Sequence, residues 1–306
     1  DGSIVSESYA PTKASNDFTL TTHVGTITAV RLDALTHPQL PRGGPGRSID
    51  GTGALTEFKL NIAPLSKDEN GDRKPAVSVK FVRAFSDANP QRRTLKPQYR
   101  NRDADKDERV VGPPGYAIDG DEVTAWTTDI GPGRSNQSRH IVFVPETPVV
   151  IDDDAEVTFT LVQKHGGWNS DDNQNFLIGR VSITDAAELP AHAVLTESES
   201  VLAMNPDDWT DSQAKLALAA WHRAIALGEL AGESAGDDTT RSAIENDLLS
   251  LDSKIESLWK QFPETTTQLV AQATQRPRET FVFSRGDFLS PTDAVQPDAP
   301  DFLHAM

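Results

Sequence analysis

The sequence predicts a mainly β protein with an α-helical appendage, and two changes of pattern along the chain lead to this prediction. Up to about residue 187, short segments rich in β-branched and aromatic residues recur between turn signals, and no helical period separates them. From about residue 211, apolar residues recur every three or four positions, as in amphipathic helices. We therefore expect a two-sheet β-sandwich or jelly roll, then an antiparallel two-helix hairpin and an extended C-terminal arm.

The strand signal is strongest where apolar and polar residues alternate. In EVTFTLV, residues 156–162, the odd-numbered positions are apolar and the even-numbered ones are mostly polar, so one face of this strand is expected to be buried. Asn70 with Gly71, and the GPPG and GPG runs at 112–115 and 131–133, are turn signals. The predicted strands lie in residues 17–24, 25–35, 54–63, 76–85, 140–145, 155–163 and 176–184.

The helical part begins near Asp211, where Thr210 or Asp211 is a suitable N-cap. A small polar connector at 232–238 separates this helix from a second one, which Pro263 ends. The apolar stripe of the first helix is Leu216, Ala220, Ala224 and Leu227, and that of the second is Ile244, Leu248, Leu251, Ile255, Leu258 and Phe262. These patterns divide the chain into a sandwich at 1–187, a helical hairpin at 188–273 and a proline-containing arm at 274–306.

Composition excludes several classes of function. Twenty-nine basic residues against 46 acidic ones give a net charge of -17, which repels nucleic acid backbones. The sequence has no cysteine, so disulfides, thiolate metal sites and covalent haem attachment within this chain are excluded. It contains no run of 18 apolar residues, so we expect no membrane span. The seven histidines show no HExxH spacing, and there is no G-x-S-x-G motif, so we expect no enzyme activity.

Four stretches carry a resemblance to a known group of proteins. RETFVFSRGDFLSPTDAVQPDAPDFL at 278–303 resembles a linker in exported planctomycete proteins, although Thr292 replaces the usual glycine after Pro291. TITAVRLDAL, LPRGGPGRSIDGTGALTEFKL and LIGRVSIT are similar to a sandwich module of the same proteins. Those proteins combine cytochrome-c-like domains with planctomycete-specific domains of unknown function.

The resemblance implies that this chain is a middle section of such a protein, with flanking domains as partners. It also implies export to the periplasm, cell surface or exterior. The first residues show no signal peptide and begin with aspartate, so we expect a processed product or an excised piece. The haem-attachment sequence of the group is absent, so no haem is expected in this chain.

The stretch AIDGDEVTAW at 117–126 is similar to the A-x-D-G-x-x-x-T-x-W signature of galactose-binding-like jelly rolls. In those folds the Asp-Gly turn wraps a calcium ion, which implies Asp119, Asp121 and Thr124 as ligands, with Glu57 as a further partner. The strand that holds Glu57 precedes the turn here, whereas the common order is the reverse. The alternative is an Asx-type turn with Trp126 in the core.

The segment from 165 to 173, HGGWNSDDN, is the best candidate for a ligand-binding loop. Sugar recognition needs an aromatic face and planar polar groups, and Trp168 with His165, Asn169 and Asp171 supplies both. We also count Trp126 among the candidate ligand-binding residues; the alternative is an ordinary polar hairpin loop. We therefore expect a non-catalytic accessory module that binds a polysaccharide or glycan, and the alternative is a structural module for protein–protein assembly.

Overall fold

In the computed structural model the chain forms two compact units, residues 1–265 and 266–306, and each is described by itself. The structure describes residues 2–5, 11–23, 25–67, 69, 71–101, 106–131, 133–167, 173–176, 178–187, 189, 193–194, 196–231, 250, 254, 257–258, 261, 280–286 and 290–295.

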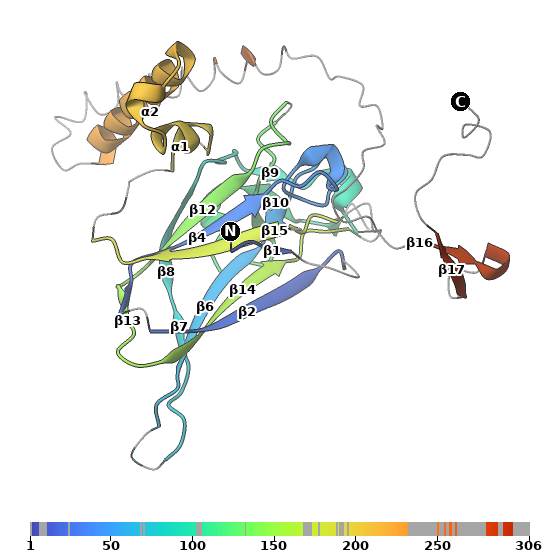
Figure 1. Ribbon diagram of the computed structural model, residues 1–306, viewed down its shortest axis with the longest axis horizontal. Coiled ribbons are helices and arrows are strands. Elements are labelled where there is room, and N and C mark those ends of the chain that lie inside the picture. The colour runs from blue at the N-terminus through green and yellow to red at the C-terminus, as the bar shows by residue number, and fades with distance from the viewer. Residues whose placement is uncertain are drawn as a thin grey trace. The chain divides into compact units, whose positions relative to one another are not determined.

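Two antiparallel sheets make up most of the first unit (Figure 1). The five-stranded sheet has the order β1 (Ile4–Val5), β15 (Ile178–Thr184), β4 (Ala29–Leu35), β12 (Arg139–Pro145) and β8 (Phe81–Ser86). The four-stranded sheet has the order β2 (Ala14–Thr22), β14 (Ala155–Gln163), β6 (Glu57–Pro64) and β7 (Val77–Val79). Strands β1 and β2 are therefore edge strands of the two sheets.

The core lies between these sheets because each central strand places alternate side chains on its inner face. Phe58 of β6 and Phe143 of β12 stack across the gap with ring centroids 4.1 Å apart. Phe159 of β14 joins them in the same buried cluster. Full burial of each such ring stabilises the fold by about 1.5–3 kcal/mol, so the stacked phenylalanines hold the two layers together.

A smaller sheet closes one end of the core. Its order is β5 (Ala54–Leu55), β11 (Thr124–Thr127), β10 (Val110–Gly112) and β9 (Arg93–Thr94), and β10 runs parallel to β11. A further pair joins β3 (Thr26–Ile27) to β13 (Val149–Val150). Trp126 in β11 is fully buried, and its indole N–H donates to the carbonyl of Ala88 at 2.8 Å.

The described helices are α1 (Thr196–Leu202) and α2 (Asp211–Ala231). Thr210 caps α2: its hydroxyl accepts from the Gln213 N–H at 3.3 Å, and the Gln213 side chain accepts from the Thr210 N–H at 2.8 Å. This reciprocal pair is a capping box, and it confirms Thr210 as the N-cap of the helix. The predicted second helix falls almost entirely outside the described residues, so the two-helix hairpin stays a prediction.

Helix α1 is tied to the outer face of the five-stranded sheet by an ion pair. Arg31 in β4 donates from both terminal nitrogens to the two carboxylate oxygens of Glu199, each at 2.8 Å. Its Nε donates to Asp33 at 2.8 Å, and Asp33 also accepts from Arg180 at 3.1 Å. This contact between strand β4 and helix α1 is therefore a bidentate, charge-assisted hydrogen bond pair.

The described residues of the second unit form a hairpin of β16 (Thr280–Phe283) and β17 (Pro291–Val295). We predicted an extended arm here, and in the described residues the two short segments pair with each other instead. Arg285 takes a left-handed backbone conformation with φ of 53° between the two strands. An extended sequence with prolines can thus still satisfy part of its backbone hydrogen bonds locally.

The prediction of a mainly β protein with an α-helical appendage is confirmed. Each of the seven predicted strand segments contains a strand, and the sheets are largely antiparallel. In the described part of residues 1–187 only short 3₁₀ turns interrupt the strands, for example Pro114–Ala117. The short strands β1, β9, β10, β11 and β13 were not predicted, because two to four residues show too little of a period.

Candidate functional site

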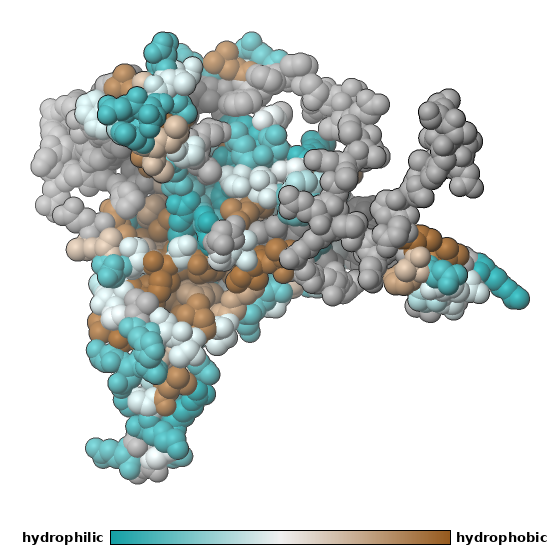
Figure 2. Space-filling model, viewed as in Figure 1, coloured by the Kyte–Doolittle hydropathy of each residue, from teal (hydrophilic) through white to brown (hydrophobic). Residues whose placement is uncertain are grey.

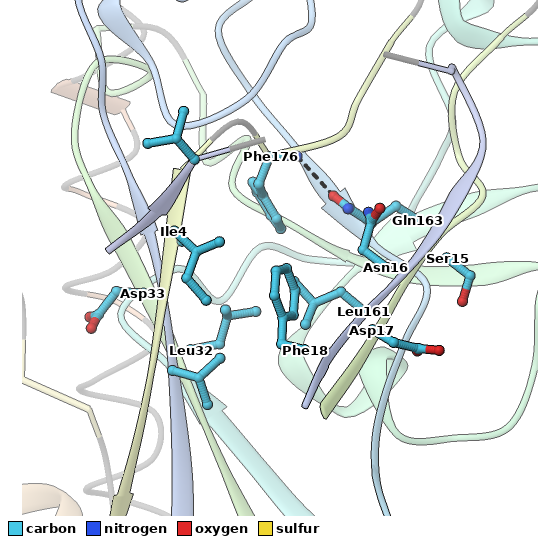
Figure 3. A pocket seen from close by; sticks show the side chains of 13 residues that line it. Ile4, Ser15, Asn16, Asp17, Phe18, Leu32, Asp33, Leu161, Gln163 and Phe176 are labelled. Carbon is cyan, nitrogen blue, oxygen red and sulfur yellow. Dashed lines mark hydrogen bonds between the residues drawn. The ribbon is translucent and has the colours of Figure 1, made fainter. Parts of the chain in front are cut away.

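A cleft opens between the two sheets on the side where β1 and β2 lie (Figure 3). Its volume is about 280 Å³. Strands β1, β15 and β4 form one wall, and β2 and β14 form the other. The lining residues are Ile4, Val5, Ser15, Asn16, Asp17, Phe18, Leu32, Asp33, Leu161, Gln163, Phe176, Gly179 and Val181.

Most of the inner surface of the cleft is apolar. Leu32 of β4 and Phe18 of β2 face each other across it, and the Phe176 ring lies at one end (Figure 3). Leu32, Leu161 and Phe176 are buried, whereas Phe18 is only partly buried. One aromatic ring is therefore accessible to a ligand in a hollow that is otherwise lined by packed aliphatic side chains.

Two amide side chains, Asn16 and Gln163, lie beside each other at the Phe176 end of the cleft (Figure 3). The Gln163 Oε1 accepts from the backbone N–H of Phe176 at 2.8 Å, which fixes the orientation of this amide and leaves its NH₂ group as a donor. The Asn16 side chain makes no hydrogen bond with the described residues. Gln163 is 2 % exposed, so the partly buried Asn16 amide is the one that offers a donor and an acceptor to a ligand.

Phe176 is held in place by Gly53 and Trp126. A Cβ atom at Gly53 would lie 2.2 Å from the Phe176 ring, so the ring occupies space that only glycine leaves free. The Trp126 ring packs against Phe176 with a centroid distance of 6.1 Å. The buried indole therefore supports the wall of the cleft from behind.

The charged groups in the described lining of the cleft are two aspartates, and both are turned outward. The carboxylates of Asp17 and Asp33 point away from the hollow (Figure 3). Asp17 accepts from the Thr160 hydroxyl at 2.6 Å, and Asp33 is paired with Arg31 and Arg180. Among the described residues that line the cleft there is no lysine, arginine or histidine.

His165 does not have the predicted role in ligand binding. It is 1 % exposed, its Nδ1 lies 3.0 Å from the Thr56 hydroxyl, and its Nε2 lies 3.1 Å from the carbonyls of Val110 and Val123. Burial lowers the pKa of His165 to about 4. A neutral imidazole that bridges three segments cannot reach a sugar, so we correct its role to a structural one.

Trp126 is corrected for the same reason, since it has no exposed surface. Trp168, Asn169 and Asp171 lie outside the described residues, so the proposed sugar contact through this loop stays a prediction. The strand end that leads into the loop is anchored by Arg109, whose guanidinium donates to the carbonyls of Lys164 and Gly166, both at 2.9 Å.

The fold brings Glu57 to the Asp-Gly turn that contains the other three predicted calcium ligands, Asp119, Asp121 and Thr124. Glu57 in β6 accepts from the Gly120 N–H at 2.6 Å. Asp119 accepts from the Asp121 N–H at 3.0 Å and from the Thr124 hydroxyl at 2.7 Å. Asp121 accepts from the Val123 N–H at 2.9 Å. Glu57 therefore contacts the turn although its strand precedes the turn in the sequence.

These hydrogen bonds form the Asx-type turn that was the alternative, and calcium binding by the same residues stays a prediction. One side-chain oxygen of each of Glu57, Asp119 and Asp121 accepts from a backbone N–H of the turn, and calcium would need six to eight oxygen ligands in all. Burial raises the pKa of Glu57 to about 7, and neighbouring Asp119 adds to this shift. Within the described residues, no three His, Asp or Glu side chains are grouped so that they could hold a metal ion.

Comparisons with protein-family models, with curated proteins and with solved structures found no match to this chain. In the part of the chain that the structure describes, no helix combines the length and apolar character needed to cross a membrane.

The sequence did contain a signal for the amides of the cleft. Asn16 lies two positions before Phe18 in β2, and Gln163 lies two positions after Leu161 in β14. Residues two apart in a strand point to the same face, so both amides face inward. A polar residue in the buried phase of a strand needs a partner or water. The sequence-based site prediction rested on loops with tryptophan and acidic residues and therefore did not include these two amides.

Proposed function

We propose that this chain is a non-catalytic carbohydrate-binding module, built on a jelly roll of the galactose-binding-like kind, and that its ligand enters the cleft between the sheets. One observation carries the proposal: an accessible phenylalanine ring, Phe18, lies in the same small hollow as the partly buried amide of Asn16, beside the buried Gln163.

The chemistry of a sugar fits this combination. One face of a pyranose ring is apolar and packs on an aromatic ring, whereas its hydroxyl groups need donors and acceptors in fixed directions. Amides supply both without charge. A hollow of about 280 Å³ lies just below the range of about 300–1,000 Å³ that drug-sized ligands occupy, so it suits a terminal sugar residue. Affinity at one such site is weak, and several copies would raise it.

The proposed setting is an exported planctomycete multidomain protein with cytochrome-c-like and planctomycete-specific domains. It rests on the resemblance of the segments at 26–35, 40–60, 177–184 and 278–303. In that setting the sandwich binds a glycan, and the helices and the C-terminal hairpin contact flanking domains.

Binding of the whole chain to a broad glycan array, followed by titration of the best ligand, tests the proposal. Asn16→Leu keeps the size of the side chain and removes both polar atoms, and Phe18→Ala removes the ring. We expect each variant to weaken binding at least tenfold. Thr21→Ala, on the exposed side of the same strand, is the matched control and should bind like the unaltered chain. Binding that survives both cleft variants would contradict the proposal.

The alternative, an assembly module, is favoured by the surface around the same cleft. Ile4 and Val5 of β1 and Leu20 of β2 are 42 %, 45 % and 46 % exposed. Both strands are sheet edges, and apolar edge strands are common sites of pairing between chains. Apolar side chains gather around β1 on the face shown in Figure 2. Two results together would favour this alternative. The chain would bind no glycan on the array, and light scattering would show a concentration-dependent dimer that Leu20→Lys abolishes.

A further inference from the structure

The lining of the cleft restricts which sugar it can hold. Seven of the thirteen lining residues are apolar: Ile4, Val5, Phe18, Leu32, Leu161, Phe176 and Val181. The amide groups of Asn16 and Gln163 lie together at one end, and the Leu32 side chain lies away from them (Figure 3). A ligand that fills the cleft therefore places a polar edge at one end and an apolar surface at the other.

The apolar end is continuous across two strands. Val181 of β15 is directly opposite Leu32 of β4 in the antiparallel register, so both project from the same face of the sheet. Both residues line the cleft, but Leu32 is 1 % exposed whereas Val181 is partly buried, so Val181 is the side chain of this pair that a ligand can touch. A hydroxyl group placed against Val181 would lose its hydrogen bonds to water without gaining a partner, which disfavours a sugar that carries one there.

Charge restricts the ligand further. The described lining contains no cationic side chain, and the nearest carboxylates, on Asp17 and Asp33, are turned outward. The chain as a whole carries a net charge of -17. A uronate or a sulfated sugar would meet repulsion and no counter-charge in the cleft, so anionic glycans are disfavoured.

From these observations we propose that the cleft selects neutral 6-deoxyhexose residues, whose methyl group replaces the hydroxymethyl group of the parent hexose. The methyl group would lie against Val181, while the ring hydroxyls would contact Asn16. This inference rests on the proposed function, because it requires that the cleft holds a sugar.

Matched sugar pairs that differ only at O6 test the inference. D-fucose with D-galactose, 6-deoxy-D-glucose with D-glucose, and L-rhamnose with L-mannose are titrated into the whole chain and followed by NMR. We expect the deoxy member of at least one pair to bind about tenfold more tightly than its parent. If sugars bind through Asn16 but no pair shows this preference, the inference is overturned and the proposed function stands. If no sugar or glycan binds in a way that Asn16→Leu removes, both are overturned.

A variant in the wall of the cleft gives a second test. Val181→Thr keeps the shape of the side chain and adds a hydroxyl that a ligand O6 can contact. We expect it to reduce the preference for the deoxy sugar at least threefold, which the ratio of the two dissociation constants measures. Val82→Thr makes the same change on an exposed residue of β8, where the side chain is 53 % exposed, and should leave the ratio unchanged. An unchanged ratio in Val181→Thr would contradict the proposed contact.

Discussion

The carboxylate of Glu57 accepts a hydrogen bond from the backbone N–H of Gly120 at 2.6 Å and so joins strand β6 to the Asp-Gly turn before β11. Glu57 is 7 % exposed, and burial raises its pKa to about 7, with Asp119 close by. A single buried acid therefore fixes the turn at the end of the core, and its protonation couples that turn to pH.

The pH dependence of stability follows from this raised pKa. Because the folded state holds the proton more tightly than the unfolded state, whose ordinary pKa is 4.5, Glu57 contributes stability below pH 4.5 that is lost as the pH rises through about 7. Glu57→Gln keeps an acceptor for Gly120 and cannot ionise. We expect it to raise the free energy of unfolding at pH 8 by about 1–3 kcal/mol and to flatten the profile between pH 5 and 8.

Urea denaturation of the two proteins at several pH values measures this effect. Glu146→Gln is a suitable control, since Glu146 is an exposed glutamate paired with Lys80. Equal pH profiles for the unaltered chain and Glu57→Gln would show that the Glu57 carboxylate is not the coupled group.

Calcium should not change the thermal stability of this protein. The backbone N–H groups of Gly120, Asp121 and Val123 each donate to a carboxylate oxygen, so these hydrogen bonds order the turn without a metal ion. We expect the same Tm with millimolar calcium and with chelator, and we expect Asp119→Ala to cost about 1 kcal/mol in both, through loss of the turn's hydrogen bonds. A Tm that rises with calcium only while Asp119 is present would instead establish the cage.

The position of Phe176 depends on the absence of a side chain at Gly53. Because an added Cβ would lie 2.2 Å from the ring, Gly53→Ala must displace Phe176 from the cleft wall and from Trp126. We expect a loss of about 1–3 kcal/mol in the free energy of unfolding, together with weaker ligand binding. Gly115→Ala is the matched control, since no atom lies within 4 Å of the added Cβ there. A Gly53→Ala protein as stable as the control would mean that the ring relaxes without cost.

The ion pair between Arg31 and Glu199 should couple helix α1 to the sheet. In a double-mutant cycle of Arg31→Met and Glu199→Gln, we expect a coupling energy of about 1 kcal/mol, since both side chains are 31 % exposed and partly screened. Salt should reduce this value. A coupling energy near zero at low salt would mean that apolar contacts of α1, such as those of buried Val201, hold it alone.

The sequence by itself determined the class of the fold and most of its strands. Alternation at Val157, Phe159 and Leu161 is a local property, since successive side chains of any strand point to opposite faces. The N-cap at Thr210 is local in the same way, because the capping box spans only four residues. The Asp-Gly turn before Trp126 was also recognisable, although its sequence did not distinguish a calcium cage from an Asx turn.

Only the tertiary structure decided which residues meet. Asn16 and Gln163 are far apart in the chain, and they share a cleft because β2 and β14 pair in a register that places both on the inner face. Burial also reversed the expected role of His165, which looked like a loop ligand and instead bridges three segments of the core. Pairing between distant strands and the desolvation that comes with it depend on the whole chain, and no local pattern records them.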